Sequence, residues 1–410
     1  MKIWMKYLIG ALLGAAIALV VPTGDQTLRG VLAFLFELSI RVGRYALVPL
    51  ILFSVPVAVF ELNEDKEFWK TLGRTVLVLV ASVAAFTLIG VITAAVVRPA
   101  RIPLLADAAP AASVLSLKDL LLDVFPPSLF STLAAPGAYL LPVYFLATLL
   151  GLAFSFDRGA TKPVLALFDS FSRIFYQINS FFAEFLGVLI ITVAAYNILE
   201  LRSSLRLDIY RPLLLVIGVE ALAMALVAIP AFLYFACGRK NPYRYLYALL
   251  APSLGALFSG DVYFALGSLT KHAKESLGIR RRSNGLVLPL AFILGRAGTA
   301  LVTATAFIVV LSSYSNLGIS VGSLAWILAA APLLTFMLSA APGGGAIVAL
   351  TALCTLYGKG FENGYLIVAP IALPLAAVGA FLDTLWAGAA ALFIAKRGGQ
   401  AQDKEARFFI

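Results

Sequence analysis

Residues 297–358 read AGTALVTATAFIVVLSSYSNLGISVGSLAWILAAAPLLTFMLSAAPGGGAIVALTALCTLYG and contain no charged side chain. As a single helix this segment would be about 90 Å long, three times the roughly 30 Å hydrocarbon core of a membrane, so the chain must fold back. Polar residues at 312–316 predict one turn. Proline and glycine interrupt helices, so Ala341-Pro342-Gly343-Gly344-Gly345 predicts the tip of a helical hairpin over residues 321–356.

The rest of the chain has the composition of an integral membrane protein. Of its 410 residues, 61% are hydrophobic and 13% are charged, and the mean hydropathy is +0.98. A soluble domain is about 25% charged, so this chain has too few polar residues for a surface in water. Its two cysteines and one histidine exclude a disulfide scaffold and a zinc cluster. The net charge of +10 indicates basic cytoplasmic loops, and no nucleic-acid partner is expected.

The pattern of apolar segments predicts an all-α polytopic protein with eight transmembrane helices and two re-entrant helical hairpins. The predicted spans are residues 7–24, 42–60, 75–97, 126–156, 181–199, 212–237, 286–311 and 365–395. The first hairpin covers residues 245–270, with its tip at Ser259-Gly260-Asp261. Prolines divide the fourth segment into short helices: Pro126, Pro127, Pro136 and Pro142.

The distribution of basic residues predicts the orientation of the chain. Most Lys and Arg residues fall on one side of the predicted spans, and cytoplasmic loops carry such an excess. We therefore expect a multi-pass protein of the cell (inner/cytoplasmic) membrane with both termini in the cytoplasm. Arg41 and Arg44 are placed on the outer side.

A third break, Gly295-Arg296-Ala297-Gly298-Thr299, falls in the middle of the seventh span. An arginine at this depth costs at least about 2.5–3.5 kcal/mol, so it needs a partner, a water-filled cavity or an anionic substrate. The candidate partners are Asp261 and Asp383. Two interpretations stay open: a structural ion pair that locks the elements together, or a site where Arg296 binds a substrate anion.

Broken helices at membrane depth are typical of transporter sites, because half-helix N-termini bind carboxylates and unwound carbonyls bind cations. We interpret Glu184 and Glu220, by contrast, as interfacial or paired, and His272 as solvated on the cytoplasmic side. The spans hold no serine–histidine or paired-aspartate arrangement, so the sequence predicts that the protein is not an enzyme.

Several short motifs follow one another in a recognisable order. They are Val48-Pro49-Leu50-Ile51-Leu52-Phe53-Ser54, Phe125-Pro126-Pro127-Ser128-Leu129-Phe130, Leu288-Pro289-Leu290, Gly298-Thr299-Ala300-Leu301, Pro342-Gly343-Gly344-Gly345-Ala346-Ile347 and Ile394-Ala395-Lys396. Over nearly its whole length, the chain resembles a divergent member of the dicarboxylate/amino acid:cation symporters, the family of glutamate transporter homologues. The resemblance implies a homotrimer in the lipid bilayer.

The resemblance also implies a division into two kinds of domain. Residues 1–71 (helices 1 and 2) and 116–205 (helices 4 and 5) would form a scaffold. Residues 72–115 (helix 3 and its loop) and 206–400 (helix 6, hairpin 1, helix 7, hairpin 2 and helix 8) would form a transport domain. The transport domain would move across the membrane like an elevator, with the second hairpin as its gate. Residues 401–410 would form a cytoplasmic tail.

By this resemblance, the chain is a secondary active symporter of a small organic anion, most simply an acidic amino acid such as glutamate or aspartate, or a dicarboxylate. The expected substrate-binding residues are Ser259, Gly260, Asp261, Arg296, Gly298, Thr299, Ala341, Pro342, Gly343, Gly344 and Asp383. No resident metal site is assigned, and sodium or a proton is the only cofactor-like species expected, as the coupling ion.

The chain departs from the family motif Asn-Met-Asp-Gly-Thr, because Gly295-Arg296-Ala297 replaces its first three residues. On the eighth helix the resemblance places Asp383 at a family asparagine and Ala387 at a sodium-ligating aspartate. It places Gly379 at the substrate-binding arginine and Ala376 at the aspartate that binds an amino group.

Loss of two family carboxylates predicts that sodium coupling is weakened or lost, since sodium is held by oxygen ligands. Arg296 could then supply the missing guanidinium. Asp261 and Asp383 are the candidate proton-coupling residues. The alternatives are a proton-coupled or uncoupled carboxylate carrier, and a transport-dead substrate sensor of the same fold.

Overall fold

The computed structural model describes residues 2–103, 122–134, 139–156, 158–203, 207–314 and 320–410. Within these ranges the regular elements are helices, accompanied by two isolated bridges that join Asp261 to Gly343 and Ile279 to Ala401. Residues 104–121, Pro136 and the last two residues of the turn expected at 312–316 lie outside the described residues, whereas residues 312–314 of that turn belong to the helix at Ala297–Tyr314.

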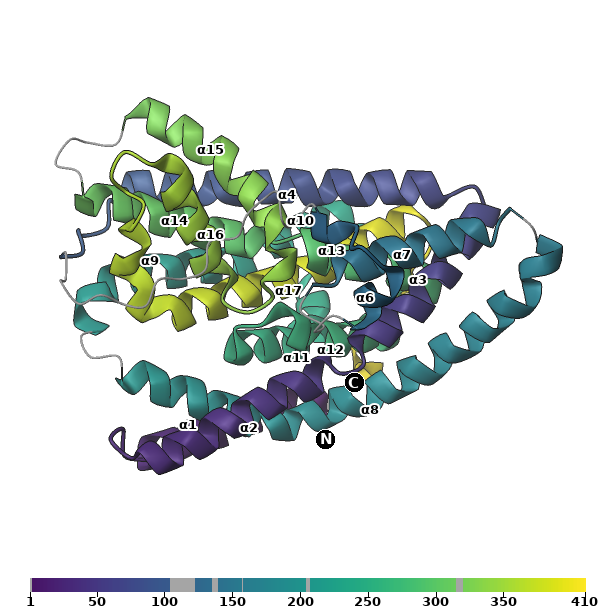
Figure 1. The fold of residues 1–410 in the computed structure, drawn as a ribbon, viewed down its shortest axis with the longest axis horizontal. Coiled ribbons are helices and arrows are strands. Elements are labelled where there is room, and N and C mark those ends of the chain that lie inside the picture. The colour runs from purple at the N-terminus through teal and green to yellow at the C-terminus, as the bar shows by residue number, and fades with distance from the viewer. Residues whose placement is uncertain (1, 104–121, 135–138, 157, 204–206, 315–319) are drawn as a thin grey trace.

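Long apolar helices form one layer of the molecule, which runs along the lower edge of Figure 1. It contains α1 (Ile3–Val20), α2 (Gln26–Arg44) and α8 (Arg158–Ser203), and α3 (Leu47–Glu64) follows α2 after a break at residues 45–46. The absence of a side chain at Gly10 allows α1 to pack closely on α8. A Cβ at this position would collide with the carbonyl oxygen of Gly187. Two short helices, α6 (Leu129–Ala134) and α7 (Leu141–Ala153), precede α8, and α7 packs on α3.

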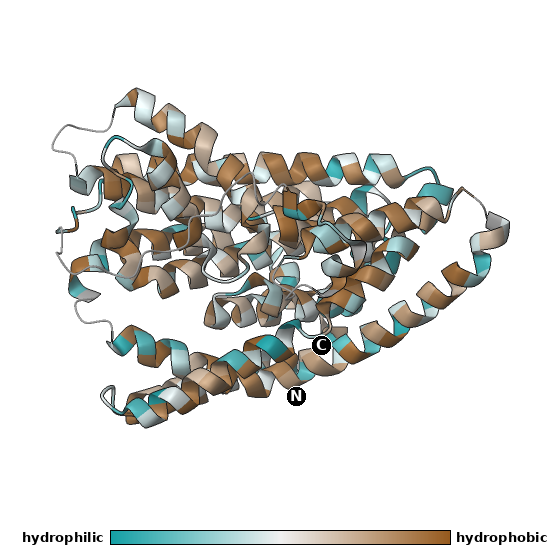
Figure 2. Ribbon diagram, viewed as in Figure 1, coloured by the Kyte–Doolittle hydropathy of each residue, from teal (hydrophilic) through white to brown (hydrophobic). Residues whose placement is uncertain are grey.

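The second part of the molecule surrounds a buried helix, α14 (Ala297–Tyr314), whose residues 297–311 are all buried. Its neighbours are α4 (Phe68–Val97), α9 (Leu207–Ala223) and α17 (Ala372–Arg397). A π-helical turn, η1 (Met224–Ala228), joins α9 to α10 (Ile229–Ala236). Figure 2 shows hydrophobic residues along most of α4, with hydrophilic residues at its end and in connecting loops. This pattern is typical of helices within a membrane.

Both predicted hairpins are present as helix–turn–helix pairs. The first consists of α11 (Tyr243–Ser259) and α12 (Val262–Glu275). The second consists of α15 (Val321–Phe336), the 3-10 turn η2 (Met337–Ala340) and α16 (Gly345–Tyr357). The predicted third break separates α13 (Arg281–Leu294) from α14 at residues 295–296. That the two pairs are re-entrant within a bilayer stays a prediction.

The described residues contain eight helices that are long and apolar enough to span a membrane, and seven of them overlap predicted spans. The eighth is residues 321–340, the first arm of the second hairpin. The predicted division of the fourth segment into short helices is confirmed for its described part, which contains α6 and α7. The predicted spans 42–60 and 181–199 were too short: the helical segments run over Gln26–Glu64 and through the 46 residues of α8.

The C-terminal segment folds back onto the helices. The 3-10 turn η3 (Gly364–Ile371) leads into α17, and the last turn, η4 (Ala406–Phe408), lies in the tail. The backbone N–H of Arg280 donates to the carbonyl of Gln400 at 2.7 Å, and Asp403 pairs with Lys240 at 2.5 Å. Lys2 and Ile410 line one surface pocket, so the two ends of the chain lie close together, below the centre of the view in Figure 1.

Candidate functional site

The turn between α11 and α12, residues 259–261, is called the first tip. Gly260 ends α11 with φ of +65°, a left-handed conformation that favours glycine. Asp261 then caps α12: its Oδ1 accepts from the backbone N–H groups of Tyr263 at 2.8 Å and Phe264 at 3.3 Å. Ser259 closes the turn, because its hydroxyl accepts from the Asp261 N–H at 3.2 Å. The sequence Ser-Gly-Asp thus ends one helix and starts the next.

The other oxygen of Asp261 forms an ion pair with Arg44 at the end of α2. The Asp261 side chain is 3% exposed and the Arg44 side chain is 24% exposed. Arg44, expected on the outer side, was not among the predicted site residues, although its position next to an apolar segment was a signal. Asp261 was also proposed as a partner of Arg296, but the structure assigns its Oδ2 to Arg44.

The second tip, residues 341–344, lies against the first. Val262 donates its N–H to the carbonyl of Pro342 at 3.2 Å, and an isolated bridge joins Asp261 to Gly343. Gly344 caps α16 with φ of +71°. The two interrupted helix pairs therefore meet at their turns, as expected for elements that build one site.

Arg296 and Asp383 form the most buried ion pair among those given for the described residues, with side chains 2% and 4% exposed. Arg296 Nε donates to Asp383 Oδ2 at 2.9 Å. Thr299 donates its backbone N–H to Asp383 Oδ1 at 3.0 Å and its hydroxyl to Oδ2 at 2.6 Å. The structure thus confirms Asp383, on α17, as the partner of the arginine at the α13–α14 break.

Small residues allow the backbone to enclose this pair. A Cβ on Gly298 would lie 2.8 Å from the Asp383 N and 2.8 Å from the Gly379 O. A Cβ on Gly345 would collide with Arg296 Nη2. Arg296 Nη1 also donates to the carbonyl of Ala341 at 3.5 Å. Ala341 of the second tip and Gly345 at the start of α16 therefore cover the guanidinium, and Arg296 is 1% exposed.

Gly379 and Ala376, where the resemblance places substrate-binding side chains that this chain lacks, lie close to Thr299 and to the first tip. A Cβ on Gly379 would lie 3.1 Å from the Thr299 hydroxyl, and a Cβ on Gly260 would lie 3.5 Å from Ala376. All eleven predicted substrate-binding residues lie in the two tips, in the first turn of α14 with the arginine before it, or on the facing turn of α17. Their roles toward a substrate stay predictions.

A sodium ion does not fit the donors at the Arg296–Asp383 pair. Both Asp383 oxygens already accept hydrogen bonds, and the guanidinium holds a fixed positive charge beside them. Ala297 and Ala387, at the family aspartate positions, offer no side-chain oxygen. The described residues contain no group of three or more His, Cys, Asp or Glu side chains suited to a metal ion.

Of the remaining expectations, Glu184 is confirmed as paired, Glu220 is buried and hydrogen-bonded but lies in none of the ion pairs given for the described residues, and the expectation for His272 is wrong. Glu184 pairs with Lys271 at 2.6 Å, and Glu220 accepts a hydrogen bond from the Thr305 hydroxyl at 3.0 Å. His272, expected to be solvated, is only 2% exposed. It lies on α12, where this helix packs against α8 and α17, so the basic sequence around it did not reveal its burial.

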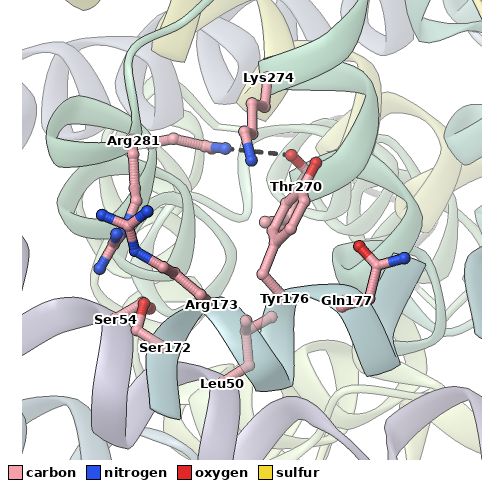
Figure 3. Close-up of a pocket in the computed structure, with 11 residues that line it drawn as sticks. Leu50, Ser54, Ser172, Arg173, Tyr176, Gln177, Thr270, Lys274 and Arg281 are labelled. Atoms are coloured by element: carbon pink, nitrogen blue, oxygen red, sulfur yellow. Dashed lines mark hydrogen bonds between the residues drawn. The ribbon is translucent and has the colours of Figure 1, made fainter. Parts of the chain in front are cut away.

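A polar cavity of about 400 Å³ lies away from these residues, between α3 and α8 on one side and α12 and α13 on the other. Figure 3 shows its basic side chains, Arg173, Lys274 and Arg281. Asp169 pairs with Arg173 at 3.0 Å and with Arg281 at 2.5 Å. The cavity lies along the predicted boundary between scaffold and transport domain.

Comparison with known proteins places the chain among transporters. A model of the "Sodium:dicarboxylate symporter family" matches residues 3–397. Neutral amino acid transporter A of Homo sapiens is 23% identical over 217 residues, which are 52% of this chain and 40% of that protein. Serine/threonine transporter SstT of Streptococcus agalactiae serotype III (strain NEM316) is 25% identical over 364 residues, 86% of this chain and 85% of that protein.

Proposed function

Because the chain belongs to the sodium:dicarboxylate symporter family, we propose that it is a secondary transporter of a small α-amino acid, which binds as a zwitterion at the Arg296–Asp383 pair. The family consists of transporters, so the chain is not an enzyme, and the eight long apolar helices within the described residues agree with a multi-pass membrane protein. The observation that carries the substrate class is the buried pair itself, one guanidinium beside one carboxylate.

The charges of this pair match those of an amino acid. A substrate carboxylate can form a bidentate ion pair with the Arg296 guanidinium. The substrate ammonium can then take the place of Arg296 as the cation that pairs with Asp383. The exchange keeps every buried charge paired, and unpaired buried charges are costly. A dicarboxylate without an amino group would bring two negative charges next to Asp383. The names of the relatives, neutral amino acid and serine/threonine transporters, agree with a zwitterionic substrate.

An acidic amino acid is the second candidate, and one observation favours it. Arg44 lies beside the second tip: its Nη2 is 3.8 Å from where a Cβ on Gly343 would stand. A side-chain carboxylate could pair with Arg44 while the α-carboxylate pairs with Arg296. Asp261 would then have to release Arg44, so this substrate costs one more ion pair than a neutral amino acid does.

The predicted elevator movement has support in the contacts between the two proposed domains. Many contacts between residues of 1–71 and 116–205 and those of 206–400 are polar, such as Glu184 with Lys271 and the Asn179 amide with the Gly267 carbonyl at 2.8 Å. Interfaces between mobile domains are more polar than protein cores. The cavity of Figure 3, which is large enough to hold water, lies at this interface between the two proposed domains. The second tip, which covers Arg296, is the proposed gate. The homotrimer stays a prediction.

Thermal unfolding of the purified protein with added ligands tests this proposal, because a ligand that binds the folded state raises the melting temperature. The panel is L-serine, L-alanine, L-aspartate, L-glutamate and succinate, each in sodium and in choline salts. We expect stabilisation by a neutral amino acid in either salt. Stabilisation by succinate alone would contradict the zwitterion site, and stabilisation that requires sodium would contradict the loss of sodium coupling.

A further inference from the structure

Glu220 is a buried carboxyl group that the proposed substrate site does not use. It lies on α9 with 4% of its surface exposed. Its two oxygens lie 3.1 and 3.0 Å from the hydroxyl of Thr305 on α14. None of the ion pairs given for the described residues includes Glu220, whereas Asp261 and Asp383 each pair with an arginine. A buried carboxylate without a cation is expensive, and a membrane protein keeps one for a functional reason.

The helices that pack on α9 bring no charged partner to this point. On α9 itself the charged residues, Asp208 and Arg211, lie about 13 Å or more along the helix from Glu220. The basic residues of α4, Lys70 and Arg74, lie in its first two turns, and α14 has no charged residue. On α17, Asp383 is bonded to Arg296 and Thr299. Lys396 and Arg397 lie at the far end of α17, and η1 is apolar.

The hydrogen bonds around Glu220 fit the neutral acid better than the carboxylate. Thr305 has one hydroxyl proton but faces three acceptors: both Glu220 oxygens and the Gly90 carbonyl of α4 at 3.4 Å. The Thr93 hydroxyl of α4 is a second hydrogen-bond neighbour of Glu220, and it donates to Ile89 O at 2.9 Å. If Glu220 carries a proton, it donates to the Thr305 oxygen, and Thr305 donates to Gly90. Each hydroxyl then has its own acceptor.

The three helices hold this arrangement firmly. A Cβ on Gly90 would lie 2.7 Å from the Leu301 carbonyl and 2.9 Å from the Thr305 hydroxyl, so the glycine allows α4 to contact α14. Residues 72–115 and 206–400 form the proposed transport domain, so Gly90, Glu220 and Thr305 would all move together. A proton bound at Glu220 would cross the membrane with the substrate.

We propose that Glu220 is the proton-binding residue that couples substrate movement to the proton gradient, in place of Asp261 and Asp383. This inference rests on the proposed transport function. The carboxylate takes one proton from water on one side of the membrane and returns it to water on the other. No other bond is formed or broken.

The test uses the full chain reconstituted in liposomes, with labelled L-serine and labelled L-aspartate as the probes and a pH-sensitive dye inside. Potassium with valinomycin clamps the membrane potential, and sodium is absent. For one proton per substrate, an outer pH lower by about one unit supports about tenfold accumulation, because both correspond to the same free energy. The wild-type protein should reach this level and acidify the interior. Glu220→Gln, which resembles the protonated acid, should lose the accumulation and the acidification.

Exchange of labelled for unlabelled substrate separates coupling from folding and binding. Glu220→Gln should keep exchange near the wild-type rate, and Glu220→Asp, which restores a carboxyl group, should recover part of the pH-driven accumulation. Glu184→Gln is the matched control, because Glu184 also lies on a long apolar helix but is 53% exposed and bonded to Lys271. It should keep the full tenfold response.

Retention of pH-driven accumulation in Glu220→Gln would overturn the inference. So would wild-type protein that ignores the pH gradient but accumulates substrate in parallel vesicles with a sodium gradient. Absence of binding and exchange for both probes in the wild-type protein would instead refute the transport function, and the coupling role with it. The exchange measurement distinguishes these two failures.

Discussion

Arg44 and Asp261 form an ion pair that joins the end of α2 to the first tip, although 217 residues separate them in the chain. In the proposed division, Arg44 belongs to the scaffold and Asp261 to the transport domain. Elevator movement would therefore have to break this pair, together with the bond from Asn179 to Gly267. In this structure the first tip is held against α2, which belongs to the proposed scaffold.

The two members of this pair differ in burial, and their substitutions should differ in cost. Arg44→Met leaves the Asp261 carboxylate, 3% exposed, without its cation. We expect a loss of about 3–5 kcal/mol of unfolding free energy, as for broken buried pairs. Asp261→Asn should cost less, because asparagine still caps α12 and Arg44, 24% exposed, can turn toward water. Thermal unfolding in detergent compares the two, and equal costs would contradict the assigned partners.

At the Arg296–Asp383 pair, charge alone should not suffice for binding. Arg296→Lys keeps the positive charge but loses the planar fork that pairs with a carboxylate. We expect a folded protein whose affinity for its amino acid falls by at least about tenfold, a difference of roughly 1.4 kcal/mol. Isothermal titration with the best ligand of the panel measures it. An unchanged Kd would mean that the pair is only structural, the other interpretation that the sequence left open.

Coupling between Arg296 and Asp383 can be measured independently of any ligand. Each of Arg296→Met and Asp383→Leu leaves one charge buried and unpaired, which should cost about 3–5 kcal/mol. The double variant removes both charges and should lose much less than the sum of the two, because residues in contact are not additive. Additive losses would show that the two side chains do not stabilise each other.

The start of α16, directly after the second tip, should tolerate no side chain beside the guanidinium. In Gly345→Ala the new Cβ displaces Arg296 Nη2, which Asp383 holds through Nε. We expect about 1–3 kcal/mol of destabilisation, as for overpacked cores, and weaker ligand binding. Gly73→Ala on α4 is the control, because a Cβ there has open space within 4 Å. It should be neutral or slightly stabilising. Equal behaviour of the two variants would contradict the close contact.

The tail offers a test by pH. Hydrogen bonds from Lys240 and then Lys396 lower the pKa of the Asp403 carboxyl to about 2. Because the folded pKa lies below the ordinary value of about 4, the stabilisation is present above pH 4 and disappears as the pH falls toward 2. Asp403→Asn should therefore melt below the wild type at pH 6, with a smaller difference at pH 3. A difference that grows on acidification would contradict this contact.

The sequence by itself determined where the helices break. Residues 259–261, 295–296 and 341–344 are interrupted as predicted, because glycine, proline and a helix-capping aspartate act within one or two turns of chain. The seven correctly placed membrane helices have the same origin: length and apolarity are local properties. Helix ends were less accurate, since α2 and α8 carry charged residues that interrupt the apolar pattern but stay within the helix.

Only the tertiary structure decided which charges meet. Arg296 had two candidate aspartates, and its partner depends on where α17 lies relative to the α13–α14 break. Arg44 reached Asp261, and His272 became buried, because α2 and α8 pack on α12. Glu220 was left with a hydroxyl as its partner for the same reason. A side chain buried in a membrane protein bonds to whatever the neighbouring helix presents, and that neighbour is chosen by packing over the whole chain.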